Sequence, residues 1–240
     1  MRLFVLILAI AMVTTCHAID LKVFLEKFRK TLQTGDSKLG IPVLDPYHLR
    51  YTYVNIYKEG LVKMKGDLEN VNAIGFSDYK PVRGDFTLIG LKVKLELLWE
   101  EMKLSSNYAL EGVLGGDIQF HGVGNIDAVL KNLTVSAELS LKVNSTTDHL
   151  YVKDSKVNAY LDKLDFWITG LYDDPELSKT LSKVISDIVP GLVNDYQDQI
   201  SQTASPIVGD ILNNGLKGLT LTDLINIITG NSLSRTDSSK

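Results

Sequence analysis

The chain has 240 residues, 45% of them hydrophobic, and a formal net charge of −4. This length and composition suffice for an ordinary hydrophobic core, in one large domain or two small ones. The acidic balance argues against nucleic acid or an anionic membrane as the main partner, and we find no basic cluster that would reverse this expectation.

The N-terminus has the pattern of a secretory signal peptide. Arg2 precedes an uncharged stretch from Leu3 to Val13, and Cys16-His17-Ala18 supplies a small-residue cleavage site. The stretch is shorter than the roughly 20 residues needed to cross a bilayer. We therefore expect residues 1–18 to be removed, leaving a secreted, extracellular chain with no stable membrane anchor. Loss of the positive Arg2 takes the net charge from −4 to −5, and loss of the single Cys16 leaves no disulfide.

Residues 19–33 predict an amphipathic helix. Its apolar side chains share one helical stripe, namely Leu21, Phe24, Leu25, Phe28 and Leu32. A helix that docks on a core is favoured over a membrane anchor. Gly35-Asp36-Ser37 is expected to end it.

The middle of the chain alternates with the period of two that is typical of strands. From Leu133 to Val143 the odd positions are apolar and the even positions are polar, and Leu91–Leu97 alternates in the same way. Further strands are predicted at Tyr51–Tyr53, Val62–Val71 and Tyr160–Leu171. One dry and one wet face indicate an antiparallel sheet. Glycines between Gly84 and Gly124 are expected to bend it strongly.

A long apolar helix is predicted after the strands. Asp174 can cap its start and Pro175 suits the first helical position. Apolar residues from Leu177 to Ile200 fill two adjacent stripes, so we expect the helix to be enclosed. Pro190 should kink or interrupt it. Ser205-Pro206 should start a second segment that ends near Asn213-Asn214-Gly215.

These elements predict an α+β fold in which a long C-terminal helix is wrapped by a highly curved antiparallel β-sheet, with a short N-terminal helix. Because no linker or repeat interrupts the chain, residues 19–231 are expected to form a single domain and 232–240 a disordered tail. Such a wrapped helix leaves an elongated apolar space of the kind that small molecules occupy.

Three stretches in chain order resemble the insect juvenile hormone binding and takeout proteins. Gly40-Ile41-Pro42-Val43-Leu44-Asp45-Pro46 is similar to their Gly-Ile-Pro-x-Leu-Asp-Pro motif. Tyr108-Ala109-Leu110-Glu111-Gly112, with Gly122-Val123-Gly124, resembles their central strands. Gly170-Leu171-Tyr172-Asp173-Asp174-Pro175-Glu176-Leu177 is similar to the entry of their long helix. The resemblance implies a helix wrapped by a curved sheet, with lipophilic ligands bound in a tube.

Two departures from the family pattern bear on the ligand. The two bridged cysteines usual near the mature N-terminus are absent, and Asp187-Ile188-Val189-Pro190 stands where the family tends to have an Asn-x-x-Trp-like patch. Both weigh against juvenile hormone itself, and the expected ligand is a juvenoid, a fatty acid or a similar lipid. Group 7 mite allergens and bactericidal/permeability-increasing-like proteins share the broad architecture, so a defence protein that binds bacterial lipid is an alternative. A stress-related structural protein is another.

No pattern of catalytic or metal-binding residues is found. His48, His121 and His149 lie far apart with no ligand spacing, so no metal is expected. Neither a nucleophile elbow nor a phosphate-binding loop is present. We expect a non-enzymatic protein without a cofactor or nucleic-acid partner, most simply a monomer that carries one small hydrophobic molecule.

The expected ligand contacts come from the dry faces and the aromatic residues. They are Tyr51, Tyr53, Val93, Leu95, Val135, Leu139, Phe166, Trp167, Leu181, Val184, Ile188 and Leu192. The four aliphatic strand residues are expected to face Leu181, Val184, Ile188 and Leu192. Two Asn-x-Ser/Thr sites, at Asn132 and Asn144, share the parity of the wet face, and at least one should be glycosylated.

Overall fold

The computed structural model describes residues 18–37, 41–59, 62–114 and 117–230. The signal peptide (apart from Ala18), Cys16 and the polar tail that the sequence predicts lie outside these ranges. No helix among the described residues is both long and apolar enough to span a bilayer.

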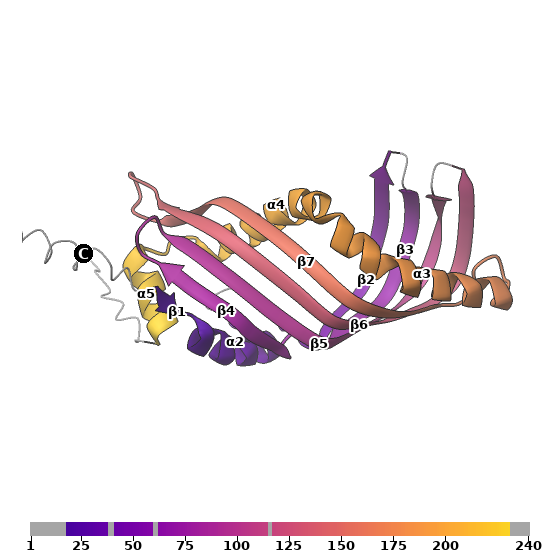
Figure 1. The fold of residues 1–240 in the computed structure, drawn as a ribbon, viewed down its shortest axis with the longest axis horizontal. Coiled ribbons are helices and arrows are strands. Elements are labelled where there is room, and N and C mark those ends of the chain that lie inside the picture. The colour runs from indigo at the N-terminus through magenta and orange to yellow at the C-terminus, as the bar shows by residue number, and fades with distance from the viewer. Residues whose placement is uncertain (1–17, 38–40, 60–61, 115–116, 231–240) are drawn as a thin grey trace, which may run out of the picture.

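Within the described ranges, seven strands form one antiparallel sheet (Figure 1). They are β1 (Ile19–Asp20), β2 (Tyr47–Lys58), β3 (Val62–Ile74), β4 (Tyr79–Thr87), β5 (Lys92–Leu114), β6 (Ile118–Val143) and β7 (Leu150–Ile168). The long β5 pairs with β6 along one edge. Its other edge pairs first with β4 and then with β3, which carries β2. The curved antiparallel sheet and the α+β class are as the sequence predicted.

Four helices accompany the sheet in the described residues. They are α2 (Lys22–Thr34), α3 (Pro175–Asp195), α4 (Gln197–Leu216) and α5 (Leu221–Thr229). The cap at Asp174 is confirmed, because its carboxylate accepts the N–H groups of Glu176 and Leu177 at 2.9 and 3.0 Å. Pro190 does not interrupt the helix and Ser205-Pro206 does not start a new one: Pro190 and Pro206 lie inside α3 and α4, and the two helices meet at Tyr196 instead.

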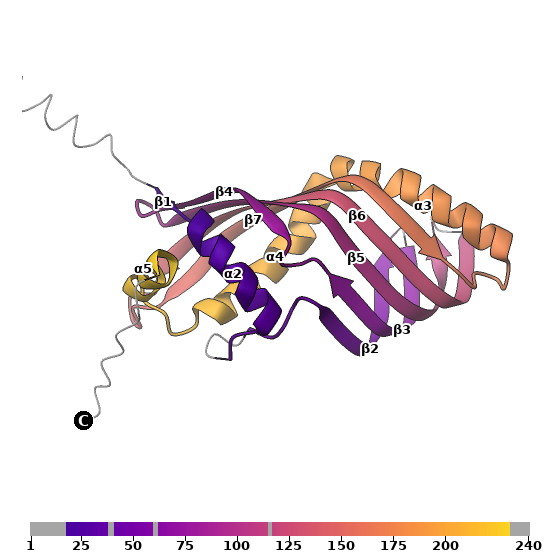
Figure 2. The same ribbon diagram turned by 90° about the horizontal axis from the view of Figure 1, so that it is seen from below.

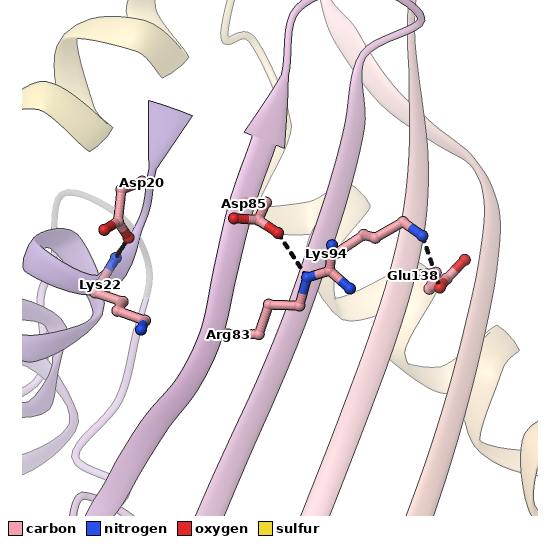
Figure 3. A network of polar contacts seen from close by, with 6 residues as sticks. All are labelled: Asp20, Lys22, Arg83, Asp85, Lys94 and Glu138. Carbon is pink, nitrogen blue, oxygen red and sulfur yellow. Dashed lines mark hydrogen bonds and ion pairs between the residues drawn. The ribbon is translucent and has the colours of Figure 1, made fainter. Parts of the chain in front are cut away.

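Cross-strand pairing defines the two faces of the sheet. Directly paired residues share a face, so Phe86, Val93 and Leu139 lie together, and Phe86 is fully buried. The opposite face carries Asp85, Lys94, Glu138 and Lys156, each paired with the next. Figure 3 shows Asp85, Lys94 and Glu138 of this row, with Lys94 bonded to Glu138 at 3.1 Å and Arg83 to Asp85 at 2.6 Å. We call the first face concave and the charged face convex.

The strands change the phase of their alternation where the sheet bends. On β5, odd-numbered residues point to the concave face as far as Trp99, whereas even-numbered residues do so from Met102 onward. Met102 itself is buried. On the neighbouring β6, Asn132 takes a left-handed backbone with a φ of 50°. A single period of two therefore does not hold along the whole strand.

The main core lies at the end of the sheet where β1, α2 and α5 meet (Figure 2). Leu21 just before α2, Leu25 of α2, Phe86 of β4 and Ile228 of α5 are all buried there. The N-terminal helix thus docks on the core, as its stripe predicted, and it closes the concave face at this end.

Helices α3 and α4 run along the free edge of β7 (Figures 1 and 2). Some backbone N–H groups of β7 and of the residues after it are not hydrogen-bonded to β6. Polar side chains of both helices accept hydrogen bonds from these N–H groups. The acceptors are Ser178, Ser182, Ser186, Asn194, Gln197, Ser205 and Asn213. Asn194 and Gln197 also donate back to the carbonyls of Leu161 and Ala159. Because an uncovered edge strand invites pairing with other chains, this polar ladder protects β7.

The expectation that the C-terminal helix is enclosed is wrong. Ile185, Val189 and Val193 pack on Leu161, Leu164 and neighbouring residues of the concave face. Ile188 and Leu192 remain 50% and 47% exposed. One side of the helix is occupied by the polar ladder and one flank by the sheet, so the rest of its apolar surface is left uncovered.

Candidate functional site

A groove of about 1070 Å³ lies between the first half of α3 and the end of β7. Its apolar lining residues are Phe166, Trp167 and Ile168 from the strand and Val184 from the helix. Of these three strand residues, only Trp167 points to the convex side, because Phe166 and Ile168 pair with Ala128 and Ile126 on the concave face. The ladder serines Ser178, Ser182 and Ser186 also line it, but their hydroxyls are bonded to the backbone of β7 and the residue Leu171. The volume suits a ligand of lipid size.

The groove opens on the convex side of the helix–strand junction. Lys183 and Asp187 line it, whereas Ile185 and Val189 of the same helix face the concave surface. Helical spacing places these two pairs on opposite flanks of α3. Trp167 lies on the convex face of β7 and is 52% exposed. Its indole N–H has no hydrogen-bond partner among the described residues, so it can donate to a ligand.

The charged rim of the groove has both signs. Lys179 and Lys183 stand beside acidic residues of the helix and of the loop before it, namely Asp173, Asp174, Glu176 and Asp187. Asp165, at the strand side, is held by Lys131 at 2.7 Å and Lys163 at 2.9 Å, and these bonds lower the pKa of its carboxyl. Asp165 therefore stays ionised at neutral pH, and an apolar ligand would lie beside this carboxylate.

An exposed apolar ridge continues along the helices. Its exposed members are Ile188, Leu192, Ile207 and Ile211, the last two being 56% and 64% exposed, and the half-buried Leu181 and Ile200 border it. Helical spacing puts Ile188 and Ile207 on the side opposite the ladder serines Ser186 and Ser205. This ridge therefore points away from β7.

The expected contact residues are distributed over three places. Phe166, Trp167 and Val184 line the groove together. Ile188 and Leu192 lie on the apolar ridge, and Leu181 borders it. Val93, Leu95, Val135 and Leu139 are on the concave face, as predicted, but they do not face the ridge residues of α3. Val135 and Leu139 pair with Ala159 and Ser155, which bond to Gln197 and Ser205 of α4.

Tyr51 and Tyr53 are on the convex face rather than pointing inward. Tyr53 pairs with Asp67, which pairs with Ala109, whereas the neighbouring pair Leu68 and Tyr108 has the opposite parity. The Tyr51 hydroxyl donates to Asp67 at 2.6 Å, and this bond raises the pKa of Tyr51. The β2 residues that face inward are Thr52, Val54 and Ile56. The prediction for Tyr51 and Tyr53 failed because the face of a short aromatic segment cannot be fixed without its partner strand.

The glycines of the central motif make room for Tyr108. This buried tyrosine donates its hydroxyl to the carbonyl of Thr169 at 2.7 Å, and burial raises its pKa. A Cβ atom on Gly122 would lie 2.6 Å from that hydroxyl oxygen. Glycine at this position therefore allows Tyr108 to join β5 to the segment that leads into α3.

The Gly-Ile-Pro-x-Leu-Asp-Pro stretch has a structural role around Asp45. Its carboxylate accepts the N–H groups of Gly75 and Ser77 at 2.9 and 2.7 Å, as well as the Ser77 hydroxyl. Gln33 at the end of α2 donates to the same hydroxyl at 3.0 Å. The motif thus ties α2 to the turn before β4.

The ladder is the feature that sequence reasoning missed. Its members from Ser178 to Asn213 recur mostly at multiples of four residues, and this pattern of small and polar residues is visible in the printed sequence. The strand β4 and the helix α5 were also missed. Within the described ranges, no group of three or more His, Cys, Asp or Glu residues is arranged to hold a metal ion.

The protein is therefore of the α+β class, with one curved antiparallel sheet and an apolar groove beside its long C-terminal helices. A model of the haemolymph juvenile hormone binding protein (JHBP) family matches residues 3–226. The chain belongs to this family, as the motifs indicated.

A similar solved structure supports the fold assignment. The crystal structure of Epiphyas postvittana Takeout 1 matches with a TM-score of 0.62 and 15% identity, over 85% of this chain and 96% of that chain. The structure of lipopolysaccharide binding protein gives a TM-score of 0.33 and 12% identity, over 80% of this chain and 41% of that chain. No curated protein matches at a significant level.

Proposed function

We propose that the protein is a secreted, non-enzymatic carrier that holds one small hydrophobic molecule in the groove between α3 and β7. The observation that carries this proposal is the 1070 Å³ groove with its aromatic and aliphatic walls. Family membership supports it, because the family is described as one of juvenile hormone binding proteins in haemolymph. The ligand we propose is a juvenoid, a fatty acid or a similar lipid, bound by a monomer.

Apolar burial sets the expected affinity. A ligand that hides about 400 Å² gains roughly 10 kcal/mol at about 25 cal/mol per Å². Association costs at least about 4 kcal/mol. About 6 kcal/mol remains, which corresponds to a dissociation constant of tens of micromolar. The indole N–H of Trp167 is the polar anchor we propose for tighter binding of an oxygen-containing lipid, in place of the convex Tyr51 and Tyr53.

Replacement of Trp167 by alanine is expected to weaken binding of a fluorescent apolar probe by roughly tenfold, because a large aromatic wall is lost. The matched control is Tyr160→Ala. Tyr160 is 51% exposed on the same strand, against 52% for Trp167, but it is outside the groove. Titration of the probe into wild type and both variants measures the effect.

Two further outcomes of the same titration would count against the groove. If Ile188→Ser weakens binding and Trp167→Ala does not, the ligand lies on the apolar ridge. If wild-type affinity falls steeply at high ionic strength, recognition is driven by charge, and the bacterial-lipid alternative is favoured. Our proposal requires an affinity that barely responds to salt.

We also propose that the secreted protein carries a glycan at Asn132 or Asn144. Both side chains are exposed. Asn132 lies within β6 and donates to Asp162 at 3.0 Å, whereas Asn144 lies just after β6, where its carbonyl accepts two N–H groups. The side-chain amide nitrogen of Asn144 is therefore the more accessible site for glycan attachment. Enzymatic deglycosylation should reduce the mass of wild type and leave an Asn132→Gln, Asn144→Gln protein unchanged. A wild type of unchanged mass would refute the proposal.

A further inference from the structure

The turn between β4 and β5 exposes aliphatic side chains where turns are usually polar. Ile89 is 75% exposed and Leu88 is 43% exposed. The turn is fixed in place, since Leu91 N–H donates to Leu88 at 3.2 Å and the Leu91 carbonyl accepts the N–H of Leu141 at 2.8 Å. These side chains are therefore held outward by the backbone.

Basic residues that are separated in the sequence surround this turn, so the fold forms a small basic cluster that the sequence did not reveal. Gly90 and Leu91 share a hollow of about 470 Å³ with Lys142, Val143 and Lys153. Lys92 begins the strand that follows the turn. Neither Lys92 nor Lys142 forms an ion pair within the described residues, whereas Lys153 is paired with Asp154 at 3.2 Å.

The neighbouring strands extend the same patch. Val143 is 37% exposed, and Tyr151, which pairs with Lys142, is 40% exposed. Figure 1 shows the β4–β5 and β6–β7 turns at the same end of the sheet, the end that also carries β1 and α5. We call this set the basic tip: Leu88, Ile89, Val143, Tyr151, Lys92, Lys142 and Lys153. The acidic and titratable residues near it are Asp154, Asp148 and His149.

We propose that the basic tip docks the protein reversibly on an anionic lipid bilayer. Aliphatic side chains at the apex can enter the headgroup region, a tyrosine suits the interface, and lysines attract anionic lipids. Two aliphatic side chains and a few lysines give weak, reversible binding rather than a stable anchor. The negative charge of the whole chain does not oppose this, because charge beyond about 8 Å is screened at physiological ionic strength. The inference goes beyond the carrier proposal and does not depend on the groove being filled.

Co-sedimentation with vesicles tests the basic tip. Wild type should bind vesicles of phosphatidylcholine that contain phosphatidylserine, and should bind pure phosphatidylcholine vesicles more weakly. Ile89→Ser should reduce binding by about tenfold, and Lys142→Gln by about fivefold. The control is Val123→Ser, because Val123 is 72% exposed on the convex face away from the tip and should leave binding unchanged.

The proteins are tested before and after deglycosylation, because Asn144 adjoins the tip. The proposal is supported if the glycosylated or the deglycosylated protein binds vesicles and Ile89→Ser reduces that binding. Absence of binding in both forms, or an equal loss in Val123→Ser, overturns it. Probe titration of Ile89→Ser should match wild type, so that failure of the tip is distinguished from failure of the groove.

Discussion

Replacement of Leu139 by aspartate is expected to destabilise the protein by roughly 3 to 5 kcal/mol, which is a large part of the stability of a typical domain. Leu139 is only 6% exposed and pairs with Val93 and Ser155 on the concave face. An aspartate there would bury a charge without a partner and would remove apolar contacts. The measurement is the free energy of unfolding from denaturant titration, supported by the melting temperature.

The control for this variant is Ser140→Asp, one residue further along β6. Ser140 is on the convex face, where it pairs with Lys92 and Asp154. A carboxylate there can reach solvent and has both signs of charge as neighbours, so the loss should be below about 1 kcal/mol. Equal losses in the two variants would show that the face assignment is wrong.

Replacement of Asp45 by alanine is expected to cost about 3 to 4 kcal/mol. The change would leave the N–H groups of Gly75 and Ser77 and the Ser77 hydroxyl without their acceptor, at about 1 to 3 kcal/mol for each buried group. Ser77 is 1% exposed, so water cannot readily replace the carboxylate. Asp85→Ala is the control, because Asp85 is a partly exposed carboxylate on the convex face and should change stability little.

The contribution of Asp45 to the free energy of unfolding should also depend on pH. Burial by itself raises the pKa of its carboxyl, but the hydrogen bonds from Ser77 and Gly75 outweigh burial and hold the pKa below its ordinary value of 3.8. A carboxyl with a lowered folded-state pKa stabilises the protein above its unfolded pKa and loses that effect as pH falls through the folded value. The stability difference between wild type and Asp45→Ala should therefore be constant near neutral pH and shrink below about pH 4. A difference that stayed constant into strong acid would contradict this assignment.

The sequence by itself determined features that depend on neighbours within a few residues. The helical stripe that includes Leu21 and Leu25, the Asp174-Pro175 helix start and the alternation around Leu139 are set by side-chain spacing and capping chemistry. These local patterns sufficed for the α+β class, the curved sheet and the family. They placed Val93, Leu95, Val135 and Leu139 on the concave face correctly.

The tertiary structure alone decided which surfaces meet. The parity of Tyr51 depends on its pairing with Glu69, and the phase change between Trp99 and Met102 depends on the bend in three strands. The rotation of α3 is decided by hydrogen bonds from residues such as Ser186 to the free edge of β7. Apolar periodicity shows that a helix has a buried stripe, but the polar edge it protects is distant in sequence. This contact turns Ile188 outward and forms the groove beside Trp167.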